Sequence, residues 1–308
     1  MKEIQYLDIL KKSFLISWKN KFLWFFGFFI FFNLVLDEFI SFSDSTSFKN
    51  STISSLSSKE ANLYLALLLL IVVSFGFLKV LSVVGLIQSI NNPTLYKQKK
   101  IKAILFGATK YFWRLLGIDL ALDLFIFFVS LFLAFPVTAL FALNARLFGI
   151  LTLIAASFIL IPLILLAFFL KKFAHIFMVL SDSNAKASLD FSYTILLKHK
   201  RASLLMFFIV LLNLIIFLSC IFGLFLVYFV VVIICSFLFA SAGGWLALSF
   251  LGSMLVILLV VASSFFNVYT QKAWFLFFSQ ISMQKNEKKA LRQEKVLEDN
   301  EVPNPEAA

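Results

Sequence analysis

Long apolar runs bounded by charged residues dominate the pattern of this chain. A bilayer core about 30 Å thick needs about 20 consecutive apolar residues in a helix, so runs of that length predict membrane-spanning helices. Six such spans are predicted, over residues 22–40, 63–90, 115–135, 148–172, 203–228 and 245–271. The predicted fold class is therefore all-α, a polytopic membrane protein. It has a single transmembrane domain over residues 1–283 and a charged, partly disordered tail over residues 284–308.

The ends of some spans admit a second interpretation. The first run follows four lysines, as the apolar part of a secretory signal does, but no small-residue cleavage site comes after it, which favours an uncleaved helix. The uncharged stretch from Ala202 to Ala242 would measure about 60 Å as one helix. Two crossings there would place the basic tail on the opposite side, so one long span followed by an apolar outer or re-entrant segment over residues 229–244 is favoured. Pro136 predicts a turn after the third span, and Pro162 predicts a kink in the fourth.

The basic residues set the orientation of these spans. With a cytoplasmic N-terminus, 23 of the 27 lysines and arginines fall in segments predicted to lie inside, three lie outside, and Lys79 lies within a span. Since cytoplasmic loops carry an excess of basic residues, the sequence predicts a multi-pass protein of the plasma (cytoplasmic) membrane with both termini in the cytoplasm. The net charge of +11 predicts contact with membrane lipids through anionic head groups, and no nucleic-acid partner is expected.

Composition excludes a soluble domain and indicates no catalytic chemistry. The chain is 62% hydrophobic and 14% charged, with 42 Phe and a mean hydropathy of +1.00, whereas globular proteins are about 45–50% apolar and about 25% charged. Cys220 and Cys235 stand in apolar runs without metal-ligand spacing. The sequence has no Gly-rich phosphate loop, paired-histidine motif or nucleophile elbow, and His175 and His199 are predicted to be solvated at the inner surface. No enzyme activity, metal or cofactor is therefore expected.

Three segments share one pattern, an amphipathic stretch followed by a basic turn and an apolar span. Aligning Lys19, Lys110 and Lys198 brings the segments into register, with apolar residues nine and five positions before each lysine. This i, i+4 spacing defines one face of a helix and predicts helices lying on the inner surface, each followed by a transmembrane hairpin. The surface helices are predicted near residues 3–19, 94–112 and 184–199. The alternative is that basic amphipathic segments precede the spans of any polytopic protein.

Three charged residues interrupt the predicted spans. Lys79 lies in the second span, and Asp119 and Asp123 lie in the third at i, i+4, so both carboxylates share one face. A charge at mid-span costs about 2.5–3.5 kcal/mol on insertion and therefore marks a candidate functional site. Similar depths predict an ion pair between Lys79 and Asp123. The alternatives are that Lys79 snorkels to the lipid head groups and that Asp119 lies at a shallow position beside Arg114.

Two asparagines complete a candidate intramembrane polar cluster. Its members are Lys79, Asp119, Asp123, Asn213 and Asn267. Asn213 is isolated in the fifth span, and Asn267 lies in the sixth at four-residue spacing from Ser263 and Gln271. Such side chains either line a cytoplasm-facing polar cavity, as in transporters, or hydrogen-bond between helices. The second interpretation is favoured.

Three segments also carry a family resemblance. They are residues 9–25 with Ser13, Trp18 and Lys19-Asn20-Lys21, residues 177–206 with Asp182, Ser192, Tyr193 and Lys198, and the Ala-Trp-Phe-Leu-Phe-Phe sequence at residues 273–278. On these residues the chain resembles the bacterial six-helix membrane proteins grouped with the glycerophosphoryl diester phosphodiesterase membrane domain and related uncharacterised families. That name comes from fusions to a soluble phosphodiesterase barrel. The present sequence shows neither the barrel nor its acidic metal ligands, so the resemblance implies the six-helix fold and not the phosphodiesterase activity.

Two classes of function follow from these patterns. The first is a non-enzymatic accessory or scaffold that acts on lipid or on membrane-protein partners through its surface-lying amphipathic helices. The second is a transporter or lipid-handling protein that uses a cytoplasm-facing polar cavity. The two differ in whether Lys79, Asp119 and Asp123 face a solvated cavity or a packed interface.

Overall fold

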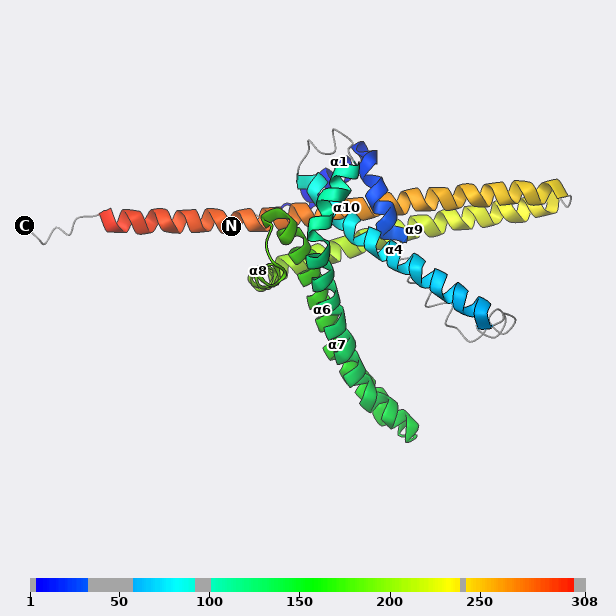
Figure 1. Cartoon of the computed structure of the whole chain (residues 1–308), viewed down its shortest axis with the longest axis horizontal. Helices are drawn as coiled ribbons and strands as arrows, with labels where there is room; N and C mark the ends of the chain where they lie inside the picture. Colours follow the sequence, from blue (N-terminus) through cyan, green and yellow to red (C-terminus); the bar gives the residue numbers. More distant parts are fainter. Residues whose placement is uncertain (1–3, 33–57, 92–100, 239–241, 302–308) are drawn as a thin grey trace, which may run out of the picture.

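Every regular element of the described chain is helical. The computed structural model describes residues 4–32, 58–91, 101–238 and 242–301 (Figure 1). The labelled elements are α1 (Tyr6–Lys19), the short 3-10 helix η1 (Lys21–Leu23), α4 (Ser58–Asn91), α6 (Ile101–Ala142), α7 (Arg146–Ser181), α8 (Ala185–Lys198), α9 (Lys200–Leu238) and α10 (Ala242–Glu301). Five helices are long and apolar enough to cross a membrane, and α1 together with residues 21–32 forms a bent pair that raises the number to six. The chain is an all-α polytopic membrane protein, as predicted.

The observed helices contain the predicted spans but extend well past them. The α6 helix has 42 residues and α9 has 39, which correspond to about 63 and 58 Å. Charged residues delimit the predicted spans, but a charge does not end a helix, because it leaves the backbone hydrogen bonds in place. In the same way α10 runs through the predicted tail boundary at residue 283 and ends at Glu301. The part of the first span after residue 32 lies outside the described residues.

Two predictions about the ends of the spans are settled by these helices. Pro136 lies inside α6, so the predicted turn at this residue is wrong; the chain turns at residues 143–145, where Asn144 adopts a positive φ of 57°. Asparagine tolerates this left-handed conformation better than most residues do. The long uncharged stretch is one continuous helix, α9, up to Leu238, which agrees with a single crossing and not with two.

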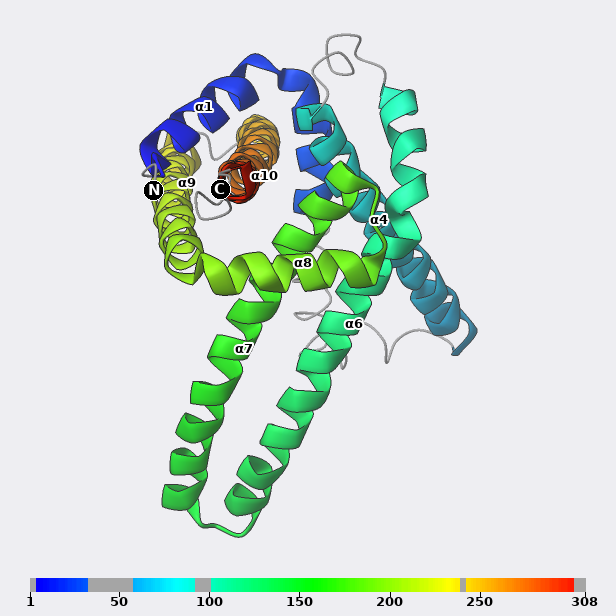
Figure 2. The ribbon, with the colours of Figure 1, turned by 90° about the vertical axis from the view of Figure 1, so that its left-hand side faces the viewer.

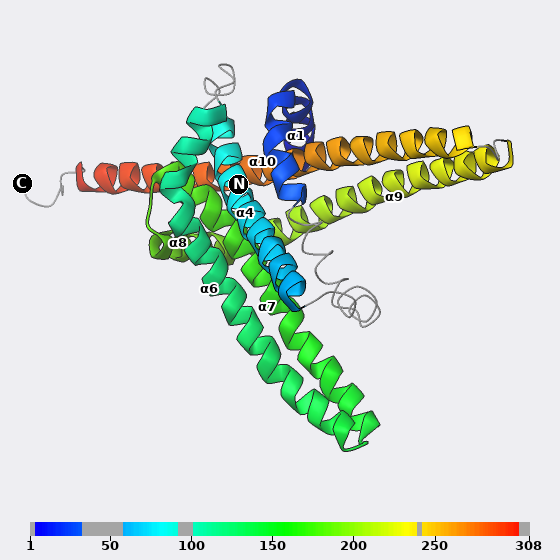
Figure 3. The same ribbon diagram turned by 45° about the vertical axis from the view of Figure 1, so that its right-hand side comes forward.

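Three helical arms project from a common hub, and the C-terminal part of α10 projects from it on the side opposite to the α9–α10 pair (Figures 1 and 3). The first arm pairs residues 24–32 with α4, where Phe75 in the middle of the helix contacts Phe29 and Phe32. The second is the α6–α7 hairpin, and the third is formed by α9 and α10, which run side by side. We define the hub as α1, α8 and the adjoining ends of the long helices. These ends are residues 79–91, 101–123, 167–181, 200–213 and 263–282.

Aromatic side chains fill the hub core. Trp274 of α10 is fully buried, and its ring lies 5.8–6.1 Å from the rings of Phe168, Phe169 and Phe173 of α7. Phe277, also fully buried, contacts both Trp274 and Phe173. Edge-to-face and tilted pairs at these distances are favourable beyond the area they bury. The hub therefore has the packed interior of an ordinary protein core.

Two short helices, α1 and α8, complete the hub from different sides. Seen along α10, α1 lies on one side of it and α8 crosses the base of the α6–α7 hairpin on the other (Figure 2). The two helices match in detail when aligned on Lys19 and Lys198. Ser13 and Ser192 fall at the same position, are fully buried, and each donates a hydrogen bond to the carbonyl four residues earlier.

The helix ends match as well. Asn20 and His199 follow α1 and α8, and the backbone N–H of each donates to the carbonyl of an isoleucine, Ile16 or Ile195. After Asn20 the chain bends by 88° into residues 21–32. The middle segment behaves differently, because residues 101–112 continue into the span as part of α6. The predicted separate helices therefore exist for the first and third segments, and the prediction of a third one near residues 94–112 is wrong.

Candidate functional site

A belt of polar contacts lies where the arms join the hub. We call it the polar belt and define it by the side chains of Asp119, Asp123, Lys171, Lys172, His175, Asn213, Tyr269 and Gln271. All of them belong to α6, α7, α9 and α10, and most contacts connect different helices. The predicted cluster is thus partly assembled, with other partners than the sequence suggested.

The two carboxylates of α6 face two basic residues of α7. Asp123 forms an ion pair with Lys171, and Asp119 Oδ1 lies 3.0 Å from His175 Nε2. The two carboxylates are four residues apart on α6, and the two basic residues are four residues apart on α7. Because the two helices are antiparallel and joined by a short turn, both pairs form side by side. Asp123 was predicted to pair with Lys79, and this prediction is wrong. The short turn places α7 alongside α6, so Lys171, and not Lys79, lies against the Asp123 carboxylate.

Lys79 lies near this group without an ion pair. Among the described residues no carboxylate oxygen comes within 4.0 Å of its nitrogen, although its charge acts on both Asp119 and Lys172. His175 was predicted to be solvated, but this α7 residue is only 8% exposed and lies beside Asp119 of α6. Two basic residues four positions apart on α7 face two acidic residues four positions apart on α6. This matched spacing on consecutive helices is the sequence signal that indicates the pairing.

The α10 helix contributes uncharged side chains to the belt. Lys172 Nζ donates to Gln271 Oε1 at 3.1 Å and thereby connects α7 to α10, and Tyr269 Oη donates to Asn213 Oδ1 at 3.2 Å and connects α9 to α10. Asn267 does not take part, because its amide donates to the Ser263 carbonyl of its own helix. Of the two predicted asparagines, therefore, only Asn213 joins helices.

A second group of polar contacts lies in the hub at the end of α7. Asp182 ends α7 in a left-handed conformation with φ of 49° and forms ion pairs with Lys110 and Arg114 of α6. The hydrogen bond from Lys110, reinforced by the nearby Arg114 charge, holds the pKa of Asp182 below its usual range. This contact fixes the turn from α7 into α8, since it anchors the last residue before that turn.

The chemistry of the belt is that of helix-to-helix attachment. Within the described ranges no group of three or more His, Cys, Asp or Glu side chains is arranged to hold a metal ion. Except where His175 approaches Asp119 without a hydrogen bond, each inter-helix contact joins a donor to an acceptor on a neighbouring helix, the pattern that connects helices inside membranes. Some buried atoms still lack a hydrogen-bond partner, among them Gln271 Nε2 and Trp274 Nε1. The belt therefore joins neighbouring helices and also contains a few buried polar atoms that have no hydrogen-bond partner.

The fold and the belt together define a multi-pass membrane protein with an organised hub at one end of its spans. No family model, curated protein or solved structure matches the chain. The resemblance to the six-helix family therefore remains a prediction, based on residues such as Ser13 and Ser192.

Proposed function

We propose that this chain is a non-enzymatic scaffold of the plasma membrane, with its hub at the cytoplasmic surface and its three arms anchored in the bilayer. The observation that supports it is the length of the arms. Between the hub and their far ends the arm helices of α4, α6, α7, α9 and α10 span roughly 27–36 Å at 1.5 Å per residue, close to the ~30 Å hydrocarbon core. Their side chains are apolar and exposed on most faces, as lipid contact requires.

The basic residues support the orientation. Exposed lysines lie on the two short hub helices α1 and α8, among them Lys11, Lys12 and Lys186. In this placement they meet the anionic head groups of the inner leaflet, each contributing about 1 kcal/mol of attraction. The Asp123–Lys171 pair then lies at the inner boundary of the hydrocarbon, where water and head groups reduce its desolvation cost.

Thiol labelling of intact cells tests this orientation. Single cysteines at Asn144, in the α6–α7 turn, and at Ser47 are expected to react with a membrane-impermeant reagent from outside. Cysteines at Lys186 and Lys289 are expected to react only after the cells are opened. Reaction at Lys186 in intact cells would place the hub outside and overturn the proposal.

A second candidate function is a transporter or lipid-handling protein, and the unpartnered Gln271 Nε2 favours it. A polar cavity would make this position accessible to water, whereas a packed interface would not. The residue is 4% exposed, so the scaffold proposal expects a Gln271→Cys variant to stay unreactive towards an impermeant thiol reagent in inside-out vesicles until it is denatured. The exposed Lys186→Cys variant is the positive control. Rapid modification of both would favour the cavity.

A further inference from the structure

Positive charge exceeds negative charge where α4, α6, α7 and α10 meet. The charged residues of this group, in chain order, are Lys79, Asp119, Asp123, Lys171 and Lys172. Three lysines thus stand against two carboxylates within the described chain, even when His175 beside them is neutral. A charge that is removed from water without a counter-ion is costly, so this excess needs a partner.

The excess falls on Lys79 and Lys172. Asp123 is already paired with Lys171, and Asp119 lies against His175. Among the residues that the structure describes, no carboxylate oxygen comes within 4.0 Å of the nitrogen of Lys79 or Lys172. The two lysines are close enough for the Lys79 charge to act on Lys172. The result is a pair of like charges, since neither lysine has a carboxylate of its own.

Lys172 has only a neutral partner, the side-chain amide of Gln271. Its ammonium donates to Gln271 Oε1 at 3.1 Å, whereas Gln271 Nε2 on the same amide is buried and has no hydrogen-bond partner. Gln271 is only 4% exposed. Unpartnered buried N–H groups are rare in native proteins, and an ion or a water molecule commonly accounts for them. Because both atoms belong to one amide, the free N–H donor lies beside the Lys172 ammonium.

The surroundings favour a small, negatively charged occupant. Trp274 follows Gln271 by one turn of α10 and is fully buried, and its ring lies 5.8 Å from that of Phe168. The Lys172 nitrogen lies over the same Phe168 ring at 5.9 Å. An ammonium and an amide N–H both donate, so the occupant has to accept from both, and a negative charge also offsets the excess. Hydrogen bonds between an ammonium and an anion are stronger than neutral ones.

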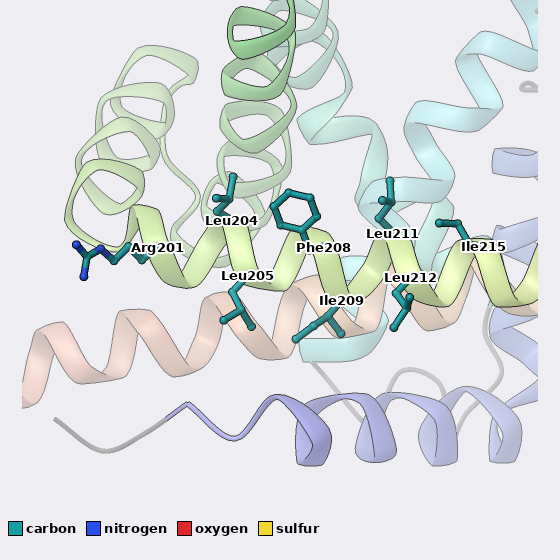
Figure 4. A pocket seen from close by; sticks show the side chains of 8 residues that line it. All are labelled: Arg201, Leu204, Leu205, Phe208, Ile209, Leu211, Leu212 and Ile215. Carbon is teal, nitrogen blue, oxygen red and sulfur yellow. The ribbon is translucent and has the colours of Figure 1, made fainter.

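Arg201 on α9 shows why exposure matters for this inference. Its guanidinium lies at one end of a shallow apolar groove along a single helix (Figure 4). The residue is exposed, so water solvates its charge and no bound anion follows from it. Lys172, in contrast, contacts a buried amide between two helices.

We propose that the hub binds one small inorganic anion, such as chloride, between Lys172 Nζ and Gln271 Nε2, with Lys79 as a second source of positive charge. The anion accepts hydrogen bonds from α7 and α10 and attracts α4, so it connects one helix of each arm. This inference goes beyond the proposed scaffold, because it gives the scaffold a ligand that stabilises the junction of its arms. It does not depend on the orientation of the hub in the membrane.

Thermal unfolding in a neutral detergent tests the anion. The melting temperature of the purified full chain is measured in sodium gluconate and in sodium chloride at equal ionic strength, so that charge screening is the same in both. At about ten times its dissociation constant, chloride should raise the melting temperature by about 3 °C relative to gluconate. Bromide should substitute for chloride. Equal melting temperatures in all three salts, as expected for a bound water molecule, would overturn the proposal.

Two variants of the site and one control provide the second measurement. Gln271→Glu places a carboxylate beside Lys172, so it should raise the melting temperature in gluconate and abolish the response to chloride. Lys172→Met should abolish the response as well, whereas Arg201→Gln, which removes an exposed cation, should retain it. If Lys172→Met does not fold, Gln271→Glu still decides the question. An unchanged chloride response in Gln271→Glu, or a wild-type response to added phosphatidylglycerol but not to chloride, would contradict a small-anion site.

Discussion

The hub and the arms of this protein both contain many large apolar side chains but are stabilised by different surroundings. In the hub, large apolar side chains such as Phe173 and Trp274 are fully buried against one another. In the arms, side chains of the same kind, such as Phe132 at 79% exposed, face outwards. The most apolar 18-residue windows of α6 and α9 are each only 6% buried within the protein. The comparison implies that the hub depends on its own packing, whereas the arms depend on the lipid around them.

The arms also differ in the contacts that hold their two helices together. The α6–α7 hairpin is held by the Asp123–Lys171 ion pair, by the approach of His175 to Asp119 and by the Asp182 turn. The pair of α9 and α10 is held by the neutral Tyr269–Asn213 hydrogen bond and by the Phe217–Phe266 stack, and Lys172 connects α10 to α7. Since ion pairs hold the hairpin and neutral contacts hold α9 to α10, changes of charge or pH are expected to act mainly on the second arm.

The largest expected effect is a cavity in the hub. Phe173→Ala should lower the free energy of unfolding in detergent by about 3–5 kcal/mol, because it removes a fully buried ring from a packed core. Phe132→Ala, the matched change on the α6–α7 arm, should change it by no more than about 0.5 kcal/mol, as surface substitutions do. Chemical denaturation followed by circular dichroism measures both. Similar losses for the two variants would remove the distinction between hub and arms.

The next effect concerns a close approach of two helices. A Cβ added at Gly27 would overlap the backbone carbonyl of Ser264 on α10, and a backbone group cannot move aside cheaply. Gly27→Ala should therefore destabilise the protein by about 1–3 kcal/mol, as overpacking does. At Gly117 of α6 no atom lies within 4 Å of an added Cβ, so Gly117→Ala should be neutral or stabilising because alanine favours helix. The melting temperatures of the purified variants decide between these outcomes.

A smaller effect is expected at the turn that holds the second arm. Asp182 has a pKa below its usual range because Lys110, and then Arg114, favour its charged form. Its stabilising contribution is therefore complete above the unfolded-state value of about 3.9 and disappears as the pH falls through the lower folded-state pKa. Asp182→Asn removes the charge but tolerates the positive φ, so it should lower the melting temperature slightly at pH 7, and the difference from wild type should vanish in acid.

Two controls sharpen this pH prediction. Asp190→Asn on α8 removes an exposed carboxylate that forms no ion pair within the described chain, and its melting curve should follow that of wild type across the same pH range. Added salt should reduce the difference at Asp182, because exposed charges are screened. A difference that persists in acid would mean that the substitution acts on the turn geometry and not on the charge.

Much of the fold could be predicted from the sequence because a membrane constrains helices by length and charge. The spans, α1, α8 and the single crossing of α9 all followed from apolar runs and basic flanks. The splay of the arms could not be predicted, since hydropathy fixes how long a helix is and not the direction in which it leaves the hub. The continuous start of α6 was also missed, because the pattern of residues 101–112 is amphipathic whether or not the helix bends afterwards.

The site was predicted in part for a related reason. Asp119 and Asp123 were recognised because charges are costly in a span, but their partners depend on which helix packs against α6. Similar depth along the membrane predicts Lys79 as the partner of Asp123. The turn at residues 143–145 instead places Lys171 and His175 opposite the two carboxylates of α6. The four-residue spacing groups Gln271 only with Asn267, and nothing in the sequence connects Gln271 to Lys172 on a helix about 100 residues away.

The smallest expected effect is the coupling between Asp123 and Lys171, which also decides between the observed and the depth-based partner. The Asp123 side chain is 65% exposed, so a coupling of about 0.2–1 kcal/mol is expected in a double-mutant cycle of Asp123→Leu and Lys171→Met. Each single change leaves one charge unpaired where the arm enters the bilayer, so the double variant should regain part of the combined loss. The matched cycle of Asp123→Leu with Lys79→Met should be additive, because Lys79 forms no ion pair with this carboxylate. Coupling in the Lys79 cycle together with additivity in the Lys171 cycle would reverse the assignment and place Lys79 at the base of the second arm.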